Sequence, residues 1–287
     1  MTTGDPHLQA TPLVSTPSSA AHDPAAYGER TAGAYDELYA DAFDTEAAVD
    51  FLTDLTGHGR LLDLGAGTGR LLVPLAERGV RVEGIEASTA MIARLRRSVT
   101  GRAVTVHQGD FGAVEAPGPY QVIVAAVSTL YMLVDQDAQL RCFANVAARL
   151  CPGGYFVVEA FVPDPSRYDR DGRRTELRSL ADQNLHLVTS RHDPLEQRVH
   201  IEHVCAGPSG LRRYPVTLRY AWPSELDVMA AAAGLTMHAR WGGWRRQPFT
   251  ADTTDHVTLY RRPFPARGTA PIGAPPRPGA GRGGTIQ

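Results

Sequence analysis

The sequence predicts an α/β fold built on a doubly wound, seven-stranded sheet, and three features of the chain lead to this prediction. Strand-like and helix-like segments alternate from residue 60 to residue 160, which is typical of a largely parallel sheet. The first strand ends in a glycine-rich turn, and the run at 120–126 is apolar enough to be buried on both faces. A chain of 287 residues can hold one such core.

The first strand runs into residues 61–70, which read Leu-Leu-Asp-Leu-Gly-Ala-Gly-Thr-Gly-Arg. Gly65, Gly67 and Gly69 lack the Cβ atom that would hinder a sharp turn and a close approach of the backbone to a ligand. The helix expected after them directs free N–H groups to the same place. A dinucleotide-binding turn needs glycine where Arg70 stands, so the spacing disfavours a nicotinamide-dependent oxidoreductase. Glycines alone are also compatible with a strand-to-helix turn that binds nothing.

The second strand, expected at residues 80–86, ends in Glu86, about twenty residues after the first glycine. A carboxylate at this position of a βαβ unit can accept hydrogen bonds from the hydroxyls of a ribose. We therefore expect Glu86 to bind a ribose rather than to be a solvated surface acid.

The G-x-G-x-G turn and the acid after the second strand resemble motif I and the ribose acid of the class I S-adenosylmethionine-dependent methyltransferases. This resemblance implies S-adenosylmethionine as the cofactor. The pattern acid-x-S-x-x-M, which recurs in that family, is similar to residues 86–91 and implies that Met91 lies near the adenine, unless it packs in the core.

The third strand, expected at 103–107, leads into Gly109 and Asp110, which look like the family's Gly-Asp pair. The resemblance implies that Asp110 accepts from the adenine amino group and that Phe111 covers the purine, unless Phe111 is ordinary core. After the fourth strand, residues 127–130 stand where the family lays its backbone against the methionine portion of the cofactor. The expected cofactor-binding residues are Tyr27, Tyr35, Asp63, Gly65, Ala66, Gly67, Gly69, Glu86, Ala87, Met91, Gly109, Asp110, Phe111, Val127 and Ser128.

Proline and glycines at 152–154 predict a turn between a helix and the fifth strand, which we expect at 155–159. A helix from 222 to 234 and strands through 241 and at 256–260 complete the sheet. The resemblance covers residues 27–262, so we expect one methyltransferase domain at 26–262.

An insertion at 184–221 contains three segments that alternate apolar and polar residues, and it predicts an antiparallel β-meander. In similar enzymes such an insertion covers the acceptor pocket or forms a dimer contact. We therefore expect the insertion either to cover the acceptor pocket or to join two copies of the chain in a homodimer. His200 and His203 are three apart and face opposite sides of a strand, so they cannot form a simple two-ligand metal site. No metal site is predicted, and His186 and His200 are candidates for a catalytic base.

Tyr35 and Tyr39 lie four residues apart in the N-terminal stretch and therefore share one helix face, which is also what amphipathic packing produces. The sequence Tyr-Asp-Glu-Leu-Tyr resembles the lid helix of amino-sugar N-methyltransferases and the glycine N-methyltransferase-like group. The resemblance implies an N-terminal helical lid in which Tyr35 covers the cofactor and Tyr39 faces the acceptor as a further catalytic candidate.

Composition excludes several other functions. The net charge is −2 with no basic stripe, which argues against a nucleic-acid or membrane partner, and the 29 basic residues are all arginine, which excludes lysine Schiff-base chemistry. Three cysteines without a disulfide or metal spacing suit a reducing cytoplasm. Residues 1–25 and 263–287, rich in Pro, Gly, Ala, Ser and Thr, are predicted to be disordered tails.

The predicted function is transfer of a methyl group from S-adenosylmethionine to an amine or hydroxyl of a small, specialised metabolite. Two alternatives keep the fold and the cofactor. One is an enzyme that catalyses cyclisation or rearrangement with the cofactor bound only structurally, and the other is a non-catalytic partner subunit.

Overall fold

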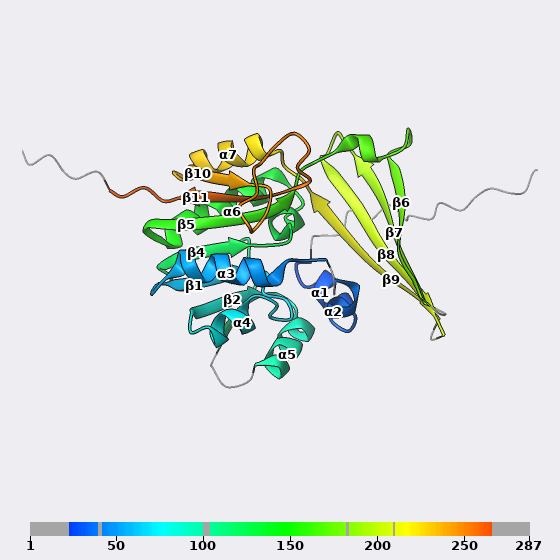
Figure 1. Cartoon of the computed structure of the whole chain (residues 1–287), viewed down its shortest axis with the longest axis horizontal. Coiled ribbons are helices and arrows are strands. Elements are labelled where there is room, and N and C mark those ends of the chain that lie inside the picture. Colours follow the sequence, from blue (N-terminus) through cyan, green and yellow to red (C-terminus); the bar gives the residue numbers. More distant parts are fainter. Residues whose placement is uncertain (1–22, 40–41, 100–103, 182–183, 209, 266–287) are drawn as a thin grey trace, which may run out of the picture.

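The computed structural model describes residues 23–39, 42–99, 104–181, 184–208 and 210–265. The chain forms a seven-stranded sheet and a separate four-stranded sheet. Figure 1 shows the four-stranded sheet standing at one end of the larger sheet, with two short N-terminal helices between them. The expected α/β architecture is confirmed. The predicted disordered tails and the start of the predicted third strand, at Ala103, lie largely outside the described residues.

The seven-stranded sheet has the order β10-β11-β5-β4-β1-β2-β3. Neighbouring strands are parallel from β5 to β3, whereas β11 runs antiparallel to both of its neighbours. Its strands are β1 (Arg60–Leu64), β2 (Arg81–Glu86), β3 (Thr105–Gln108), β4 (Tyr120–Ala125), β5 (Leu150–Phe161), β10 (Thr236–Trp241) and β11 (Asp255–Arg261).

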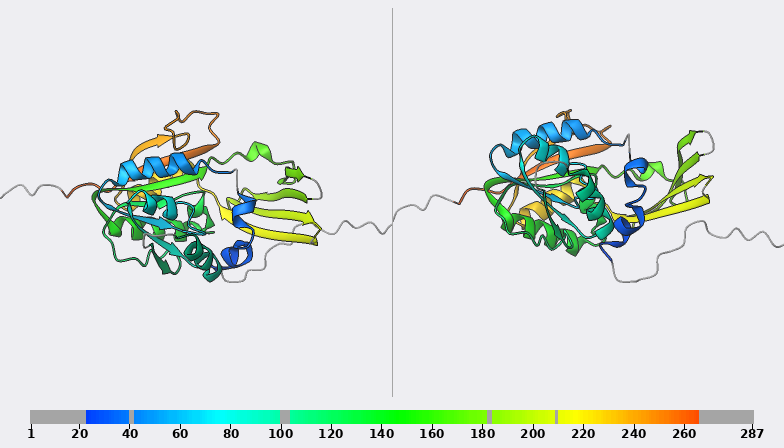
Figure 2. Two further views of the ribbon diagram at one scale, coloured as in Figure 1. Left: turned by 60° about the horizontal axis from the view of Figure 1, so that its bottom comes forward. Right: turned by 90° about the horizontal axis from the view of Figure 1, so that it is seen from below.

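Helices cover both faces of this sheet, as Figure 2 shows from two further directions. The helices are α1 (Ala26–Thr31), α2 (Tyr35–Leu38), α3 (Thr45–Thr56), α4 (Leu72–Glu77), α5 (Thr89–Ser98), α6 (Gln136–Arg149) and α7 (Pro223–Ala232), with short 3₁₀ turns η1 (Thr129–Met132) and η2 (Pro165–Arg167). In β4, Val122 and Val124 pack with α3 and α4, whereas Ile123 packs with α6 and α7. The strand is therefore apolar on both faces because two layers of helices cover it.

The fifth strand begins earlier than the sequence predicted. β5 starts at Leu150, which pairs with Tyr120, and the register shifts before Tyr155 pairs with Val122. A Cβ atom on Gly154 would lie 3.0 Å from the carbonyl oxygens of Cys151 and Gln121. The glycines therefore form a bulge inside the strand, where only glycine tolerates the close backbone, rather than a turn before it.

The four-stranded sheet has the order β6-β7-β8-β9 and is antiparallel throughout, with β6 (Arg173–Ala181), β7 (Asn184–Asp193), β8 (Arg198–Gly207) and β9 (Gly210–Arg219). Three of these strands fall in the predicted insertion at 184–221, but the sheet begins at residue 173 with a strand that the sequence did not reveal. β6 is an edge strand whose large apolar side chains are exposed, Leu177 by 55% and Leu180 by 69%. It buries too little to show an alternating pattern.

A buried polar cluster joins this sheet to the core. Arg219, at the end of β9, is 6% exposed and donates to Gln139 of α6 at 2.6 Å and to Glu225 of α7 at 2.7 Å. It also donates to Gln197 at 3.1 Å. These bonds fix the base of the four-stranded sheet against α6 and α7. Within the described ranges, no helix is long and apolar enough to cross a membrane.

Candidate active site

The glycine turn after β1 has the geometry that only glycine adopts easily. Gly65, Gly67 and Gly69 have φ angles of +73°, +57° and +92°. A Cβ atom on Gly65 would lie 2.8 Å from Thr129 Cγ2, whereas one on Gly67 would meet nothing closer than 3.9 Å. The turn is therefore packed on one side and open at Gly67, where a ligand can approach the backbone.

Glu86, at the end of β2, closes the turn. Its two carboxylate oxygens accept from the N–H of Gly67 and the N–H of Ser88, both at 2.8 Å. Burial raises the pKa of Glu86, and these backbone donors counteract that rise. Each oxygen keeps a further lone pair, so the carboxylate can also accept from ribose hydroxyls.

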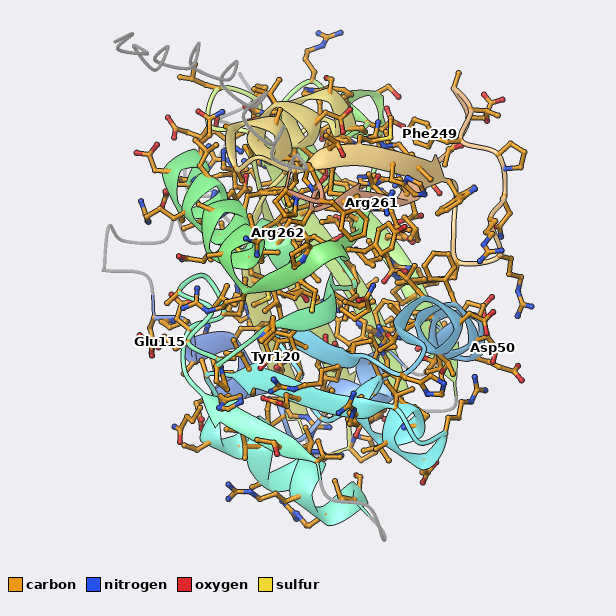
Figure 3. All side chains as sticks on the ribbon, turned by 90° about the vertical axis from the view of Figure 1, so that its left-hand side faces the viewer. Asp50, Glu115, Tyr120, Phe249, Arg261 and Arg262 are labelled. Atoms are coloured by element: carbon orange, nitrogen blue, oxygen red, sulfur yellow. The ribbon has the colours of Figure 1, made fainter. Side chains whose placement is uncertain are left out.

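An open hollow lies beside this turn, at the carboxyl ends of β1 and β4. Figure 3 views the molecule from the opposite end, where Tyr120 marks the start of β4, so the hollow lies on the far side, towards the four-stranded sheet. Its lining residues are Tyr35, Asp63, Gly65, Ala66, Gly67, Thr68, Arg70, Leu71, Ala126, Val127 and Thr129.

The hollow carries two opposite charges. Asp63 is 4% exposed, and burial raises the pKa of its carboxyl to about 7. Among the described residues no group donates a hydrogen bond to this carboxyl, although the charge of Arg70 opposes the pKa rise. Arg70 donates to Thr45 at 3.0 Å, and its guanidinium lies 4.7 Å above the Phe43 ring. A ligand with both an ammonium and a carboxylate group would complement this pair.

The segment after β4 is strained and is held by Glu159. Val127 and Ser128 have φ angles of +53° and +57°, which a β-branched residue rarely adopts. Glu159, at the end of β5, accepts from the N–H of Val127 at 2.7 Å and from the Trp244 indole at 2.6 Å. Strain of this kind persists only where surrounding contacts impose it, and it shapes the hollow here.

Two acids anchor the N-terminal helices beside the hollow. Glu29 of α1 accepts from the hydroxyls of Ser88 and Thr89, both at 2.9 Å, at the start of α5. Asp36 of α2 accepts from Thr68 at 2.7 Å and pairs with Arg94 at 2.8 Å. These contacts hold Tyr35 against the glycine turn, where it lines the hollow.

The predicted cofactor residues divide into two groups. Tyr35, Asp63, Gly65, Ala66, Gly67 and Val127 line the hollow, and Gly69 and Glu86 shape the turn next to it. Further away, Gly109 donates to the Glu86 carbonyl at 3.1 Å, Asp110 caps its own turn by accepting from the Gly112 N–H at 2.8 Å, and the side chains of Met91 and Phe111 are buried. Ala87 follows Glu86 after β2, and Ser128 follows Val127 after β4. The Tyr27 hydroxyl bonds that of Tyr39.

The predicted catalytic residues lie around the four-stranded sheet. The Tyr39 hydroxyl lies 2.9 Å from that of Tyr27 and 3.0 Å from His203 Nε2. His186 lies 3.1 Å from the other nitrogen of His203. His200 instead lies 3.0 Å from the Thr217 hydroxyl, on the opposite face of β8. The structure thus brings Tyr39 and His186 together through His203 and does not bring His200 to them.

Sequence reasoning missed several residues of the site. The hollow is also lined by Thr68, Arg70 and Thr129, which lie within the 61–70 and 127–130 segments already expected at the cofactor, and by Leu71 and Ala126, which only flank those segments. Glu159 had no such signal, because it acts through a contact with a residue distant in the chain. His203 is one of the histidines of the insertion, but the sequence does not distinguish it from His200, because the choice depends on its contact with Tyr39. Among the described residues, no group of three or more His, Cys, Asp or Glu side chains could hold a metal ion.

The residues present fit the expected adenosyl cofactor. An open glycine turn, a ribose-competent carboxylate and a pair of opposite charges that suits an amino-acid group occur together at one edge of the sheet. Asp63 lines the hollow and is 4% exposed, so its carboxylate is placed where it could accept from a cationic group.

Comparison with known proteins agrees with this geometry. Residues 61–154 match a family model described as a methyltransferase domain. The CcbJ methyltransferase from Streptomyces caelestis is 36% identical in sequence and superimposes with a TM-score of 0.79 over 84% of this chain and 100% of that one.

Two further relatives cover most of the chain. The cypemycin N-terminal methyltransferase of a Streptomyces species is 26% identical over 245 residues, which are 84% of this chain and 99% of that protein. The S-adenosylmethionine-bound amino pentose methyltransferase CalS10 from Micromonospora echinaspora shares the fold, with a TM-score of 0.61 and 24% identity over 79% of this chain and 96% of that one.

Proposed function

The chain belongs to the class I S-adenosylmethionine-dependent methyltransferases, and we propose that it methylates an amine or hydroxyl group of a small, specialised metabolite. Its cofactor is S-adenosylmethionine. The observation that carries the proposal is the hollow in which Asp63 and Arg70 face the open glycine turn. Nitrogen is the preferred acceptor atom, because the relatives named above act on an N-terminus and on an amino pentose.

We assign the cofactor contacts from the chemistry of the donors and acceptors. Arg70 would bind the carboxylate of the methionine portion, Asp63 its ammonium group, and Glu86 the ribose hydroxyls. Tyr35 would cover the cofactor from the lid formed by α1 and α2. The adenine contacts of Met91, Asp110 and Phe111 remain proposals from the family resemblance.

The cofactor supplies a methyl group that is already activated by its positive sulfur. The protein therefore has to orient the acceptor, exclude water and manage one proton. Tyr39 is suited to the last task because its hydroxyl bonds both Tyr27 and His203 beside the lid. His186 belongs to the same hydrogen-bonded group, and His200 is a separate candidate on the other face of the sheet.

Calorimetry with S-adenosylhomocysteine tests the cofactor assignments. Replacing Glu86 by Ala should weaken binding about 100-fold, since it removes charged hydrogen bonds to the ribose and the bonds that close the turn. The matched control is Glu115→Ala, whose side chain is on the surface in Figure 3. Equal affinity in both variants would contradict the assignment of Glu86.

A paired screen tests the acceptor. Methyl-labelled S-adenosylmethionine is incubated with an N-terminal peptide amine, an amino-sugar nucleotide, and the analogue of each in which a hydroxyl replaces the amine. Label in the amines alone supports N-methylation. Label in the hydroxyl compounds alone supports O-methylation. Tight cofactor binding without label in any probe or metabolite extract would contradict methyl transfer to a small molecule.

The four-stranded sheet also suits a homodimer contact. Its outer strands β6 and β9 are edges within the described chain, and Leu177, Leu180 and Leu211 are exposed on them. Sedimentation of the full chain against a Leu177→Glu variant tests this, because a dimer through this sheet would dissociate in the variant.

A further inference from the structure

A continuous chain of hydrogen bonds runs from the lid into the four-stranded sheet. The Tyr27 and Tyr39 hydroxyls are 2.9 Å apart, and Tyr39 Oη lies 3.0 Å from His203 Nε2. His203 Nδ1 lies 3.1 Å from His186 Nε2. The chain begins beside the hollow, because the Tyr39 ring centroid is 4.9 Å from that of Tyr35. It ends at His186 on β7, which is only partly buried.

Neutral groups can order the protons of this chain in only two ways. In the outward order, Tyr39 donates to His203 Nε2 and His203 donates from Nδ1 to His186 Nε2, so both histidines carry their proton on Nδ1. In the inward order, every bond is reversed and both histidines carry their proton on Nε2. One proton that enters at Tyr39 and one that leaves from His186 Nδ1 convert the first order into the second.

The surroundings keep all of these groups neutral near pH 7. Burial lowers the pKa of His203 to about 4 and also lowers that of His186. The charges of His186 and Arg178 act in the same direction on the pKa of His203. Burial raises the pKa values of Tyr39 and Tyr27. The charged side chains that face the chain are Arg178 of β6, which favours neutral histidines, and Glu37 of α2, which acts oppositely on His186.

We propose that Tyr39, His203 and His186 form a relay that carries a proton from a methylated amine to solvent. This proposal rests on the proposed methyltransferase function. The amine nitrogen uses its lone pair to form the new N–C bond, and the C–S electron pair stays on sulfur. The resulting ammonium gives its proton to Tyr39 Oη as the Tyr39 proton moves to His203 Nε2. The His203 Nδ1 proton passes to His186 Nε2, and the His186 Nδ1 proton passes to water.

The relay also selects the acceptor class. A neutral amine attacks with its own lone pair and becomes an ammonium, which then releases its proton with a pKa of about 10, whereas an alcohol is a poor nucleophile until a base takes its proton as it attacks. A chain of neutral groups that ends in weakly basic histidines can pass on the ammonium proton but is too weak a base to activate an alcohol. The relay therefore fits an amine acceptor. His203 and His186 act through Tyr39 and are positioning residues.

Nuclear magnetic resonance of the full-length protein with ¹⁵N-labelled histidine tests the relay without an acceptor. Long-range ¹H–¹⁵N spectra report which ring nitrogen carries the proton. We expect His186 and His203 to show the same tautomer and to be neutral at pH 7. Tyr39→Phe should shift the His203 Nε2 resonance, whereas the control His238→Gln, on β10, should leave both rings unchanged. Unlike tautomers, or an imidazolium on either residue at pH 7, would overturn the relay.

Calorimetry on the same samples separates this relay from the proposed function. Failure to bind S-adenosylhomocysteine would remove the function whatever the tautomers, whereas binding with unlike tautomers would remove only the relay. With an amine identified in the paired screen, His203→Gln should lower kcat about 10-fold at pH 7, with an unchanged KM for S-adenosylmethionine and partial rescue by added imidazole. An unchanged kcat and pH profile would contradict the relay.

Discussion

The two sheets of this protein are assembled from the sequence in different ways. The cofactor side of the seven-stranded sheet is formed by consecutive segments, so the glycine turn and Glu86, which bonds it, are 19 residues apart. The proposed acceptor side is formed by distant segments, and Tyr39 bonds a histidine 164 residues away. The family model accordingly matches residues 61–154 and stops before the four-stranded sheet. Local spacing encodes the cofactor turn, whereas the proposed acceptor chemistry depends on how distant elements pack.

The largest expected effect comes from breaking the contact between the two regions. Arg219→Ala leaves Glu225 and Gln139 without their buried partner, and should lower the free energy of unfolding by about 3 kcal/mol. The control Arg245→Ala removes an exposed ion pair with Asp44 and should cost less than about 1 kcal/mol.

Urea denaturation measures both values, and amide hydrogen exchange shows where the loss occurs. Faster exchange confined to β9 would mean that the four-stranded sheet loosens before the core unfolds. If Arg219→Ala and Arg245→Ala were equally mild, the polar cluster would not be what joins the sheets.

The next effect separates acceptor chemistry from cofactor binding. Tyr39→Phe should lower kcat about 10- to 100-fold for an amine acceptor, since it removes the hydroxyl that is proposed to take the proton, and should leave the affinity for S-adenosylhomocysteine unchanged. Tyr120→Phe is the matched control. It removes a 2.8 Å bond to Glu83 at the other end of the sheet and should lower stability without lowering kcat.

The strands and the glycine turn of the cofactor side could be predicted because each of their signals is local. Alternation of strands and helices gave the sheet, and the glycine spacing gave the turn that the structure places beside the hollow. The prediction of a turn at Gly154 is wrong because proline and glycine mark turns and bulges alike. Strand β6 was missed because an exposed edge strand has no buried face to impose a pattern.

The acceptor side could be predicted only in part. The resemblance of the N-terminal stretch singled out Tyr39, and the histidine content of the insertion singled out His186. The sequence could not show that His203, rather than His200, contacts Tyr39, because both lie on one strand and the choice depends on which face of β8 meets the N-terminal helices. Likewise, nothing near Val127 indicated that Glu159 would hold it.

A smaller effect tests the glycine turn itself. Gly65→Ala should weaken the affinity for S-adenosylhomocysteine about 10-fold, because the new Cβ atom would lie 2.8 Å from Thr129 and push the turn out of place. Gly57→Ala is the control, since Gly57 also has a positive φ, of +53°, but a Cβ there meets nothing within 4 Å. Both substitutions strain the backbone by placing alanine at a positive φ, but only Gly65→Ala would also push a side chain into the contact that holds the turn beside the hollow. Calorimetry on the two variants measures the difference, and equal affinities would show that the turn tolerates a side chain.

The smallest effect is the pH dependence of Asp63. The pKa of Asp63 is about 7 in the folded protein, against an ordinary value of 3.8 for an exposed aspartate. Between pH 3.8 and pH 7 the folded state therefore holds a proton that the unfolded state has lost. The stability contributed by Asp63 therefore falls as pH rises through this window, by about 1 kcal/mol from pH 6 to pH 8. Asp63→Asn should remove this loss, and the Tm of the cofactor-free variant at pH 8 should exceed that of the wild type by a few degrees.

The cofactor should reverse the same effect in the wild type. An ammonium group beside Asp63 favours its charged form, so S-adenosylhomocysteine should raise the wild-type Tm more at pH 8 than at pH 6. In Asp63→Asn the rise in Tm should be smaller and should not vary with pH. Thermal melts with and without the ligand give the rise in Tm for each of the two proteins at each of the two pH values. If the ligand raised the wild-type Tm by the same amount at both pH values, the ammonium group would bind elsewhere. The burial of Asp63 would then lower the stability of the protein without contributing to cofactor binding.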